Sequence, residues 1–257
     1  MFYGEQRKMA LSDPELPHDN RTAEIGGEVD GERIFLDRRV YIQFAAYTGC
    51  LSTEELVGEI AAASIPCVIY EDVNDPTGIG LAVTFEKPYR FLTELRDFLQ
   101  NSLFAKLERR HELTMFGRTY AIGYEKDLHE TLLRKPIGRL TDESLQWAIW
   151  YPLRRKGGYE ALTAKEQHDV QIEHMQAGRS FATDTGIKDI RLASFGMTAA
   201  DDDFVVALLG PDLHPLSQAV QLMRKSKQTS LHLQRLGPFF TGRVAARVVR
   251  KDMFDFA

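Results

Sequence analysis

Apolar and polar residues recur with regular periods from about residue 39 onward, and the period changes repeatedly between that of strands and that of helices. Short runs rich in β-branched and aromatic residues predict strands, whereas apolar residues spaced along one helical face predict amphipathic helices. The predicted elements of the first half are a strand at 39–47, a helix from Ser52 to about Ser64, strands at 67–73 and 78–86, a helix at 88–102 and a strand at 112–124. Their order is β-α-β-β-α-β.

The second half repeats this order. Its predicted elements are a strand at 145–155, a helix at 160–178 that ends at Gly178, strands at 186–197 and 203–210, a helix at 214–227 and a strand at 237–249. Two β-α-β-β-α-β units in one chain indicate a duplicated ferredoxin-like fold. We therefore expect an α+β protein whose two units form a dimeric α+β barrel within one chain.

The expected organisation is a polar arm followed by two ferredoxin-like halves. The first 34 residues are rich in Gly, Pro and Asp and lack a sustained apolar period, so we expect a mobile or loosely docked segment there. We place the N-terminal arm at 1–36, the first half at 37–135 and the second half at 145–250.

Composition narrows the range of functions. The 257 residues are 44% hydrophobic and 27% charged, as is typical of a soluble globular protein. A net charge of −5 argues against nucleic acid as the main partner. The sequence has no apolar run of about 20 residues and no signal-peptide region, which argues against membrane insertion and secretion. The two cysteines have neither metal-ligand nor disulfide spacing, so we expect a cytoplasmic protein.

The strand predicted at 186–197 places an acid and a base on one face. Residues two apart share a face, which separates the set Ile187, Asp189, Arg191 and Ala193 from the set Lys188, Ile190, Leu192 and Ser194. We expect the second, mostly apolar set to pack on the helices and the first set to face a cavity lined by the sheet. Alternatively, Asp189 and Arg191 form an ordinary surface ion pair.

The stretch "VQIEHMQAGR" contains one histidine, His174, near the end of its predicted helix. A single helical histidine is either a solvated side chain or a ligand, and the stretch alone does not decide between them. The other histidines form no zinc-binding pattern, and the sequence has no phosphate-binding glycine motif and no nucleophile elbow.

Four segments together resemble a known family. They are "WYPLRRKGGYEAL" (150–162), "EHMQAGRSF" (173–181), "IKDIRLASFGMTAADDDFVVAL" (187–208) and "MRKSKQTSLHLQRLGPFFTG" (223–242). Their order and spacing are similar to those of the chlorite dismutase-like superfamily of haem proteins, which includes the coproheme decarboxylases of bacterial haem synthesis. The resemblance implies a haem, either iron coproporphyrin III or haem b, in the second half.

The resemblance also implies roles for particular residues. His174 matches the proximal ligand of the haem iron, and Tyr151 matches a tyrosine beside a propionate that becomes a radical in decarboxylation; a core aromatic is the alternative for Tyr151. Arg155 resembles a residue that pairs with a propionate. Further propionate contacts are expected from Arg224, Thr229 and Ser230, with the choice between Thr229 and Ser230 left open by a length difference of one residue.

The chain also departs from the family. Chlorite dismutases have an arginine over the open haem face, where this sequence has Asp189, and a glutamate behind the proximal histidine, which we match to Leu209. Both changes argue against chlorite chemistry. Many decarboxylases have glutamine or histidine at the position of Asp189, whereas a distal Asp/Arg pair is typical of dye-decolourising peroxidases, which share the duplicated ferredoxin-like architecture. We therefore expect Asp189 to move a peroxide proton and Arg191 to stabilise the developing charge.

The expected function is peroxide-dependent oxidative decarboxylation of coproheme to haem b, with hydrogen peroxide and the porphyrin as substrates. One alternative is a haem b peroxidase-like enzyme that acts on an external substrate, and another is a non-catalytic haem-binding or carrier protein. Because family members form rings, the resemblance implies a homo-oligomer, most simply a pentamer.

Overall fold

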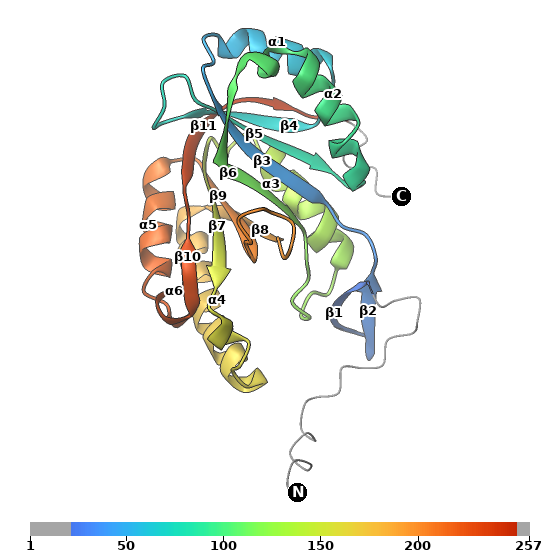
Figure 1. The fold of residues 1–257 in the computed structure, drawn as a ribbon. Coiled ribbons are helices and arrows are strands. Elements are labelled where there is room, and N and C mark those ends of the chain that lie inside the picture. The colour runs from blue at the N-terminus through green and yellow to red at the C-terminus, as the bar shows by residue number, and fades with distance from the viewer. Residues whose placement is uncertain (1–21, 251–257) are drawn as a thin grey trace, which may run out of the picture.

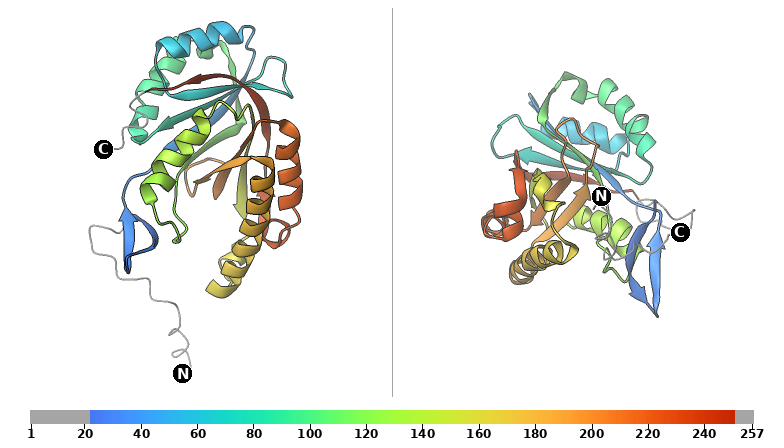
Figure 2. Two further views of the ribbon diagram at one scale, coloured as in Figure 1. Left: turned by 180° about the vertical axis from the view of Figure 1, so that it is seen from behind. Right: turned by 60° about the horizontal axis from the view of Figure 1, so that its bottom comes forward.

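The computed structural model describes residues 22–250. Within this part of the chain, eight antiparallel strands close into a barrel against which the helices pack (Figures 1 and 2). The barrel strands are β3 (Tyr41–Thr48), β4 (Cys67–Asp72), β5 (Ile79–Phe85), β6 (Glu108–Arg118), β7 (Trp147–Arg155), β8 (Lys188–Ala193), β9 (Phe204–Gly210) and β11 (Phe240–Val248). None of the helices in residues 22–250 combines the length and apolar character needed to cross a membrane.

Both halves have the strand order of a ferredoxin-like unit, which confirms the predicted duplication. The order is β6-β3-β5-β4 in the first half and β11-β7-β9-β8 in the second. Each half thus places its fourth strand beside its first and its third beside its second. The two seams between the halves differ: β11 pairs with β4 along most of its length, whereas β6 and β8 share the single pair Arg118 and Ala193.

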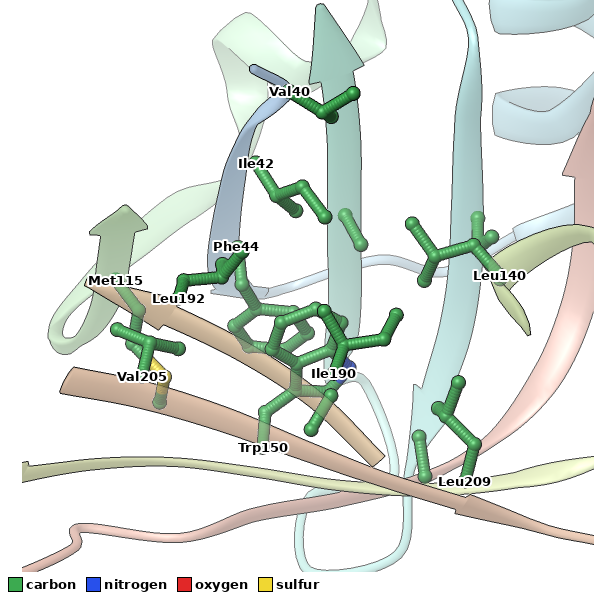
Figure 3. Packing of buried hydrophobic residues seen from close by; sticks show 14 of the residues in the cluster. Val40, Ile42, Phe44, Met115, Leu140, Trp150, Ile190, Leu192, Val205 and Leu209 are labelled. Atoms are coloured by element: carbon green, nitrogen blue, oxygen red, sulfur yellow. The ribbon is translucent and has the colours of Figure 1, made fainter. Parts of the chain in front are cut away.

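The barrel interior is filled with side chains from both halves. Phe44 of β3 stacks on Trp150 of β7 (Figure 3), with ring centroids 5.0 Å apart. The ring centroid of Phe240 of β11 lies 4.8 Å from that of Phe44. A Cβ atom at Gly80 would lie 2.5 Å from the Phe240 ring, so a glycine is needed there for this packing. Aromatic side chains from both halves therefore occupy the space between the two half-sheets.

The face prediction for β8 was wrong in one respect. Ile190 and Leu192 point into the barrel, where they join the cluster around Trp150 (Figure 3), and not toward the outer face. Asp189 and Arg191 lie on the opposite, outer face, toward the helices. Central strands of the barrel carry apolar residues on both faces. The sequence alone therefore did not show which face of β8 points inward.

Helices cover the outer faces of the two half-sheets. The first half carries α1 (Thr53–Ala62) and α2 (Glu94–Asn101), and the second carries α4 (Ala164–Thr185) and α5 (Leu213–Met223). Short 3₁₀ turns occur at Pro88–Phe91, Leu103–Lys106 and Gly157–Tyr159. The single helix predicted at 88–102 is thus two elements.

Several elements were not predicted. A π-helical turn, Glu130–Arg134, continues into α3 (Lys135–Thr141) between the halves, and α6 (Lys227–His232) leads into β10 (Leu233–Leu236), which pairs with the end of β7. In addition, β6 ends at Arg118, six residues before the predicted end. Because α3 lies beside the weakly paired seam between β6 and β8, its apolar residues Ile137 and Leu140 complete the barrel core.

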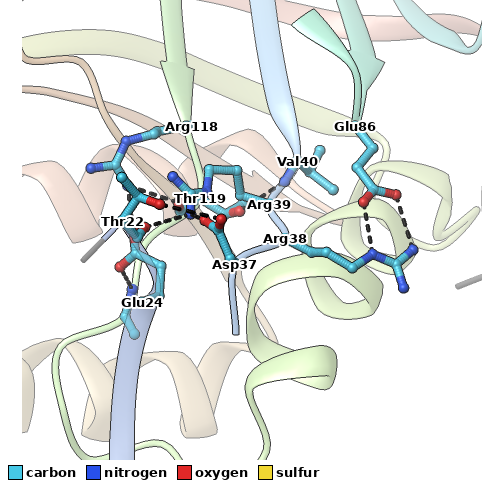
Figure 4. Close-up of polar contacts among 10 residues, drawn as sticks. Thr22, Glu24, Asp37, Arg38, Arg39, Val40, Glu86, Arg118 and Thr119 are labelled. Carbon is cyan, nitrogen blue, oxygen red and sulfur yellow. Dashed lines mark hydrogen bonds and ion pairs between the residues drawn. The ribbon is translucent and has the colours of Figure 1, made fainter. Parts of the chain in front are cut away.

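A hairpin precedes the barrel in the described part of the chain. Residues 1–21 of the expected arm lie outside the described residues, but β1 (Glu24–Val29) and β2 (Glu32–Leu36) form a hairpin that the sequence did not predict. Glu24 forms an ion pair with Arg118 at the end of β6 (Figure 4). The hairpin is therefore fixed to the first half.

Candidate functional site

The outer face of the second half-sheet brings three predicted site residues together. The strand register aligns Tyr151 of β7 with Val206 of β9, and Val206 with Arg191 of β8. In antiparallel strands, directly opposed residues share a face, so these three side chains form one row. Asp189 lies one step along the same face, opposite Leu208.

Asp189 is held by two arginines. Its Oδ2 forms an ion pair with Nε of Arg191 at 3.1 Å, and its Oδ1 accepts a hydrogen bond from Nη1 of Arg139, also at 3.1 Å. Arg139 comes from α3 and was not among the predicted site residues. The three side chains line a pocket with Tyr120 and Lys135, and burial together with the charge of Arg139 lowers the pKa of Lys135. The pocket is thus lined by three cationic side chains, Lys135, Arg139 and Arg191, and by two carboxylates, Asp189 and Glu125.

Helix α4 is positioned by its ends and by its neighbouring helices. Thr163 and Glu166 form a reciprocal capping box at the start, which satisfies free backbone N–H groups. The helix ends at Gly186, whose φ of 71° suits a glycine. Gly178, the predicted end, lies inside the helix. Of the 22 residues of α4, only Val170 is buried. The helix packs mainly against α5 and α6.

His174 is half-buried on α4 and has a defined partner. Its Nδ1 lies 2.9 Å from the hydroxyl of Ser226, which follows α5. Burial and the nearby positive charges of Arg191 and Arg155 lower the pKa of His174 from 6.5 to about 4. The imidazole is therefore neutral at pH 7, and a neutral imidazole nitrogen can bind a metal ion.

Arg155 ends β7 beside the same group of charges. Its guanidinium lies 4.2 Å from the ring centre of Tyr159 and 4.7 Å from that of Phe204. Its Nε is buried and has no hydrogen-bond partner among the described residues. An unpaired buried donor is costly, and a carboxylate of a bound molecule would satisfy it.

The acidic turn that precedes β9 fixes this end of the sheet. Asp201 forms an ion pair with Arg154, and Asp202 forms one with Arg235. The carboxylate of Asp203 accepts a hydrogen bond from the backbone N–H of Arg155 at 2.6 Å. The three consecutive aspartates thus hold β7 and β10 in place next to the site.

Tyr151 is 7% exposed and packs against Phe239, with ring centroids 4.9 Å apart. Burial raises the pKa of its phenol, and the negative charge of Asp189 adds to this effect. No hydrogen bond to its hydroxyl is present within residues 22–250. The phenol is therefore protonated at neutral pH.

A second pocket contains the remaining predicted contacts. Arg224, Thr229 and Ser230 line it together with Leu233 and Leu236 of β10. The Arg224 guanidinium lies 5.9 Å from the ring centre of Phe239, the ring that also packs on Tyr151. The predicted residues therefore gather in one region on the outer face of the second half.

The position matched to the family's glutamate differs from expectation. Leu209 points into the barrel core, away from α4, so it is not the residue behind His174. Ser226 has that place, and it lies within the segment "MRKSKQTSLHLQRLGPFFTG" that carried the resemblance. Nothing in the sequence favours this serine over its neighbours, because its contact depends on how α4 and α5 pack.

Comparison with known proteins assigns the family. The sequence profile of the chlorite dismutase family matches residues 91–245. The chain belongs to this family. No curated protein sequence matches it closely enough to be recognised as related.

Solved structures share the fold at low sequence identity. A candidate chlorite dismutase has a TM-score of 0.64 and 15% identity, covering 85% of this chain and 98% of its own. A haem-binding protein from Thermus thermophilus has a TM-score of 0.65 and 18% sequence identity, and the match covers 81% of this chain and 92% of the other. The third structure is a tryptophan-to-valine variant of the chlorite dismutase of Candidatus Nitrospira defluvii. It has a TM-score of 0.63 and 18% sequence identity, and the match covers 86% of this chain and 95% of the other. These likenesses extend over most of the barrel.

Proposed function

We propose that the chain binds an iron porphyrin in the second half, 145–250, through His174. Family membership and the likeness to a haem-binding protein support this proposal. The observation that carries it is the neutral imidazole of His174 near an unpartnered arginine donor, Nε of Arg155. His174 would bond the iron, and Arg155, Arg224, Thr229 and Ser230 would hold the porphyrin carboxylates.

The reaction we propose is oxidative decarboxylation of coproheme to haem b. Each propionate side chain, –CH₂–CH₂–CO₂H, reacts with one H₂O₂ to give a vinyl group, CO₂ and two H₂O. When bound, the iron porphyrin supplies a redox-active metal that accepts oxidising equivalents from peroxide. Because the porphyrin is also the substrate, the product must leave the site after each reaction.

The chain's own residues have separable tasks in this proposal. Asp189 takes a proton from one peroxide oxygen and returns it to the other. Arg191 and Arg139 hold the Asp189 carboxylate and stabilise negative charge as the O–O bond breaks. Tyr151, whose buried phenol is protonated at neutral pH, would pass one hydrogen atom to the peroxide-derived oxidant and take one back from the propionate, so that the tyrosine ends the reaction unchanged.

A second candidate is a haem b peroxidase with an external substrate. The pair formed by Asp189 and Arg191 favours it, because this pair can activate peroxide whether or not the porphyrin is the substrate. In that case Tyr151 only contacts a propionate.

Reconstitution with coproheme and titration with hydrogen peroxide test the proposal. We expect a new absorption band on adding coproheme, followed by loss of two carboxyl groups by mass spectrometry. Oxidation of an added dye without a mass change would favour the peroxidase, and binding without reaction would favour a carrier. A lack of any spectral change with coproheme and haem b would contradict haem binding altogether.

The assembly is a separate proposal. We propose a homopentamer located in the cytoplasm, on the basis of family membership. Light scattering of the purified protein would measure the oligomer mass, and a monomer would contradict the proposed ring.

A further inference from the structure

The two shortest contacts of the Ser226 hydroxyl fix its orientation; its contacts with the backbone N–H and the hydroxyl oxygen of Thr229 are longer, both 3.4 Å. Its oxygen lies 2.8 Å from the carbonyl oxygen of Met223 and 2.9 Å from Nδ1 of His174. A carbonyl oxygen only accepts hydrogen bonds, so the hydroxyl hydrogen is donated to Met223. The serine oxygen must then accept a hydrogen bond from Nδ1–H of His174. The residue is 6% exposed, so water does not readily replace either bond.

We propose that Ser226 is the positioning residue of His174, and that it holds the imidazole as the Nδ1–H tautomer with a free electron pair on Nε2. In a neutral imidazole one nitrogen carries the proton and the other can bond a metal. The hydrogen bond made by the nitrogen that does not bind the metal determines which tautomer forms and how the ring is oriented. This inference rests on the proposed function only where the metal is taken to be the haem iron.

The uncharged hydroxyl has a further consequence. A carboxylate in its place would draw the Nδ1 proton toward itself and make the imidazole a more strongly donating ligand. A serine oxygen does this much less. With serine in that place, a bond from His174 to a porphyrin iron would be weaker than with a carboxylate, which suits a porphyrin that is substrate and product rather than a permanent cofactor.

Ser226 also belongs to the start of α6. Its oxygen accepts a hydrogen bond from the backbone N–H of Thr229 at 3.4 Å, as an N-cap does. The same hydroxyl thus connects the histidine to the helix that carries Thr229 and Ser230, two proposed carboxylate contacts. A shift of α6 would be transmitted to the imidazole through this one oxygen.

Nitrogen NMR of the ligand-free protein, with ¹⁵N-labelled histidine, tests the tautomer directly. We expect the Nε2 resonance of His174 in the unprotonated range and the Nδ1 resonance in the protonated range at about pH 7.5, well above the imidazole pKa. Ser226→Ala should reverse the populations toward the Nε2–H form that free histidine prefers, and Ser226→Thr, which keeps the hydroxyl, should restore the wild-type pattern. Ser52→Ala removes the cap of α1 far from the site and should leave His174 unchanged.

Transfer of bound haem to excess apomyoglobin tests the consequence for the iron bond. We expect Ser226→Asp to slow haem loss by about 10–100-fold, the usual size of such indirect effects on metal sites, and to raise the iron–histidine stretching frequency in the ferrous protein. An Nε2–H tautomer in the wild type, or transfer rates equal in wild type and Ser226→Asp, would overturn the proposal. Since the NMR experiment needs no haem, it gives a result even if haem binding itself fails.

Discussion

Arg139 on α3 and Asp189 on β8 are joined by a hydrogen bond of 3.1 Å, although 50 residues separate them in the sequence. Arg139 also donates to the main-chain carbonyl of Asp189. The contact lies at the seam where β6 and β8 share a single residue pair. It therefore ties the segment between the two halves to the strand that carries the proposed peroxide-handling pair.

Arg139→Met should destabilise the fold modestly. The change removes one ion pair and one hydrogen bond at a partly exposed position, so we expect a loss of about 1 kcal/mol in free energy of unfolding, measured with urea. Arg96→Met on the exposed face of α2 is the control, with an expected change below about 0.5 kcal/mol. In a double-mutant cycle with Asp189→Asn, a coupling of zero would contradict the paired arrangement.

Asp189→Asn should lower the peroxide-dependent rate while leaving porphyrin affinity nearly unchanged. The amide keeps the size of the side chain but has little ability to accept a proton, and general acid–base catalysis is commonly worth about 10²–10⁴-fold. Stopped-flow measurement of the reaction with peroxide gives the rate, and titration with coproheme gives the affinity. If the variant reacts as fast as the wild type, Asp189 does not move the proton.

Tyr151→Phe should abolish decarboxylation and preserve coproheme binding. The phenyl ring keeps the contact with Phe239, and since the hydroxyl makes no hydrogen bond within residues 22–250, the fold should be little affected. The products after peroxide addition would be measured by mass spectrometry. Full conversion to haem b in this variant would rule out hydrogen transfer through Tyr151, and dye oxidation should persist in either case.

The pKa of His174 predicts a loss of stability in acid. The folded-state pKa of about 4 lies below the ordinary value of 6.5, so between these values the unfolded chain binds a proton that the folded chain does not. The free energy of unfolding of the ligand-free protein should therefore fall as the pH drops from 6.5 to about 4, by up to about 3 kcal/mol from this group.

His174→Gln is the matched variant for this experiment, because it keeps a polar side chain that does not titrate. The difference in unfolding free energy between variant and wild type should grow in the variant's favour from pH 6.5 to about pH 4 and be constant above about pH 7. A difference that does not change with pH would show that the histidine is not held in its neutral form by its surroundings.

The fold was predictable because its signals are local. Short apolar runs such as 203–210 and the cap at Ser52 follow from short-range chemistry, and the order of the elements repeats. The inner and outer faces of β8 were not predictable, since Ile190 joins the barrel core and Ile187 the cluster under α5, so both faces carry apolar residues.

The site residues that could be predicted lie in the segments that resemble the family. His174, Tyr151 and Arg191 lie in matching motifs, and the structure brings them to one region. Ser226 and Arg139 were missed, because the first depends on how α5 packs on α4 and the second lies on a seven-residue helix. Contacts between segments far apart in the chain produce no periodic pattern in the sequence, so they could not be predicted from it.

Gly80→Ala tests whether the two halves share one core. The added methyl group would lie 2.5 Å from the Phe240 ring and 2.8 Å from that of Phe44, and both rings are fixed by neighbours from the other half. Because the interior cannot expand without separating strands, we expect a loss of about 1–3 kcal/mol in free energy of unfolding.

Gly58→Ala is the matched control: it lies in helical backbone of α1 with open space around the new methyl group, so it should stabilise by about 0.5–1 kcal/mol. Tryptophan fluorescence reports on Trp147 and Trp150, which both belong to β7 of the second half. If the halves unfold as one unit, Gly80→Ala lowers the unfolding midpoint measured by this fluorescence, although the mutation is in the first half. An unchanged midpoint would mean that the halves have independent cores.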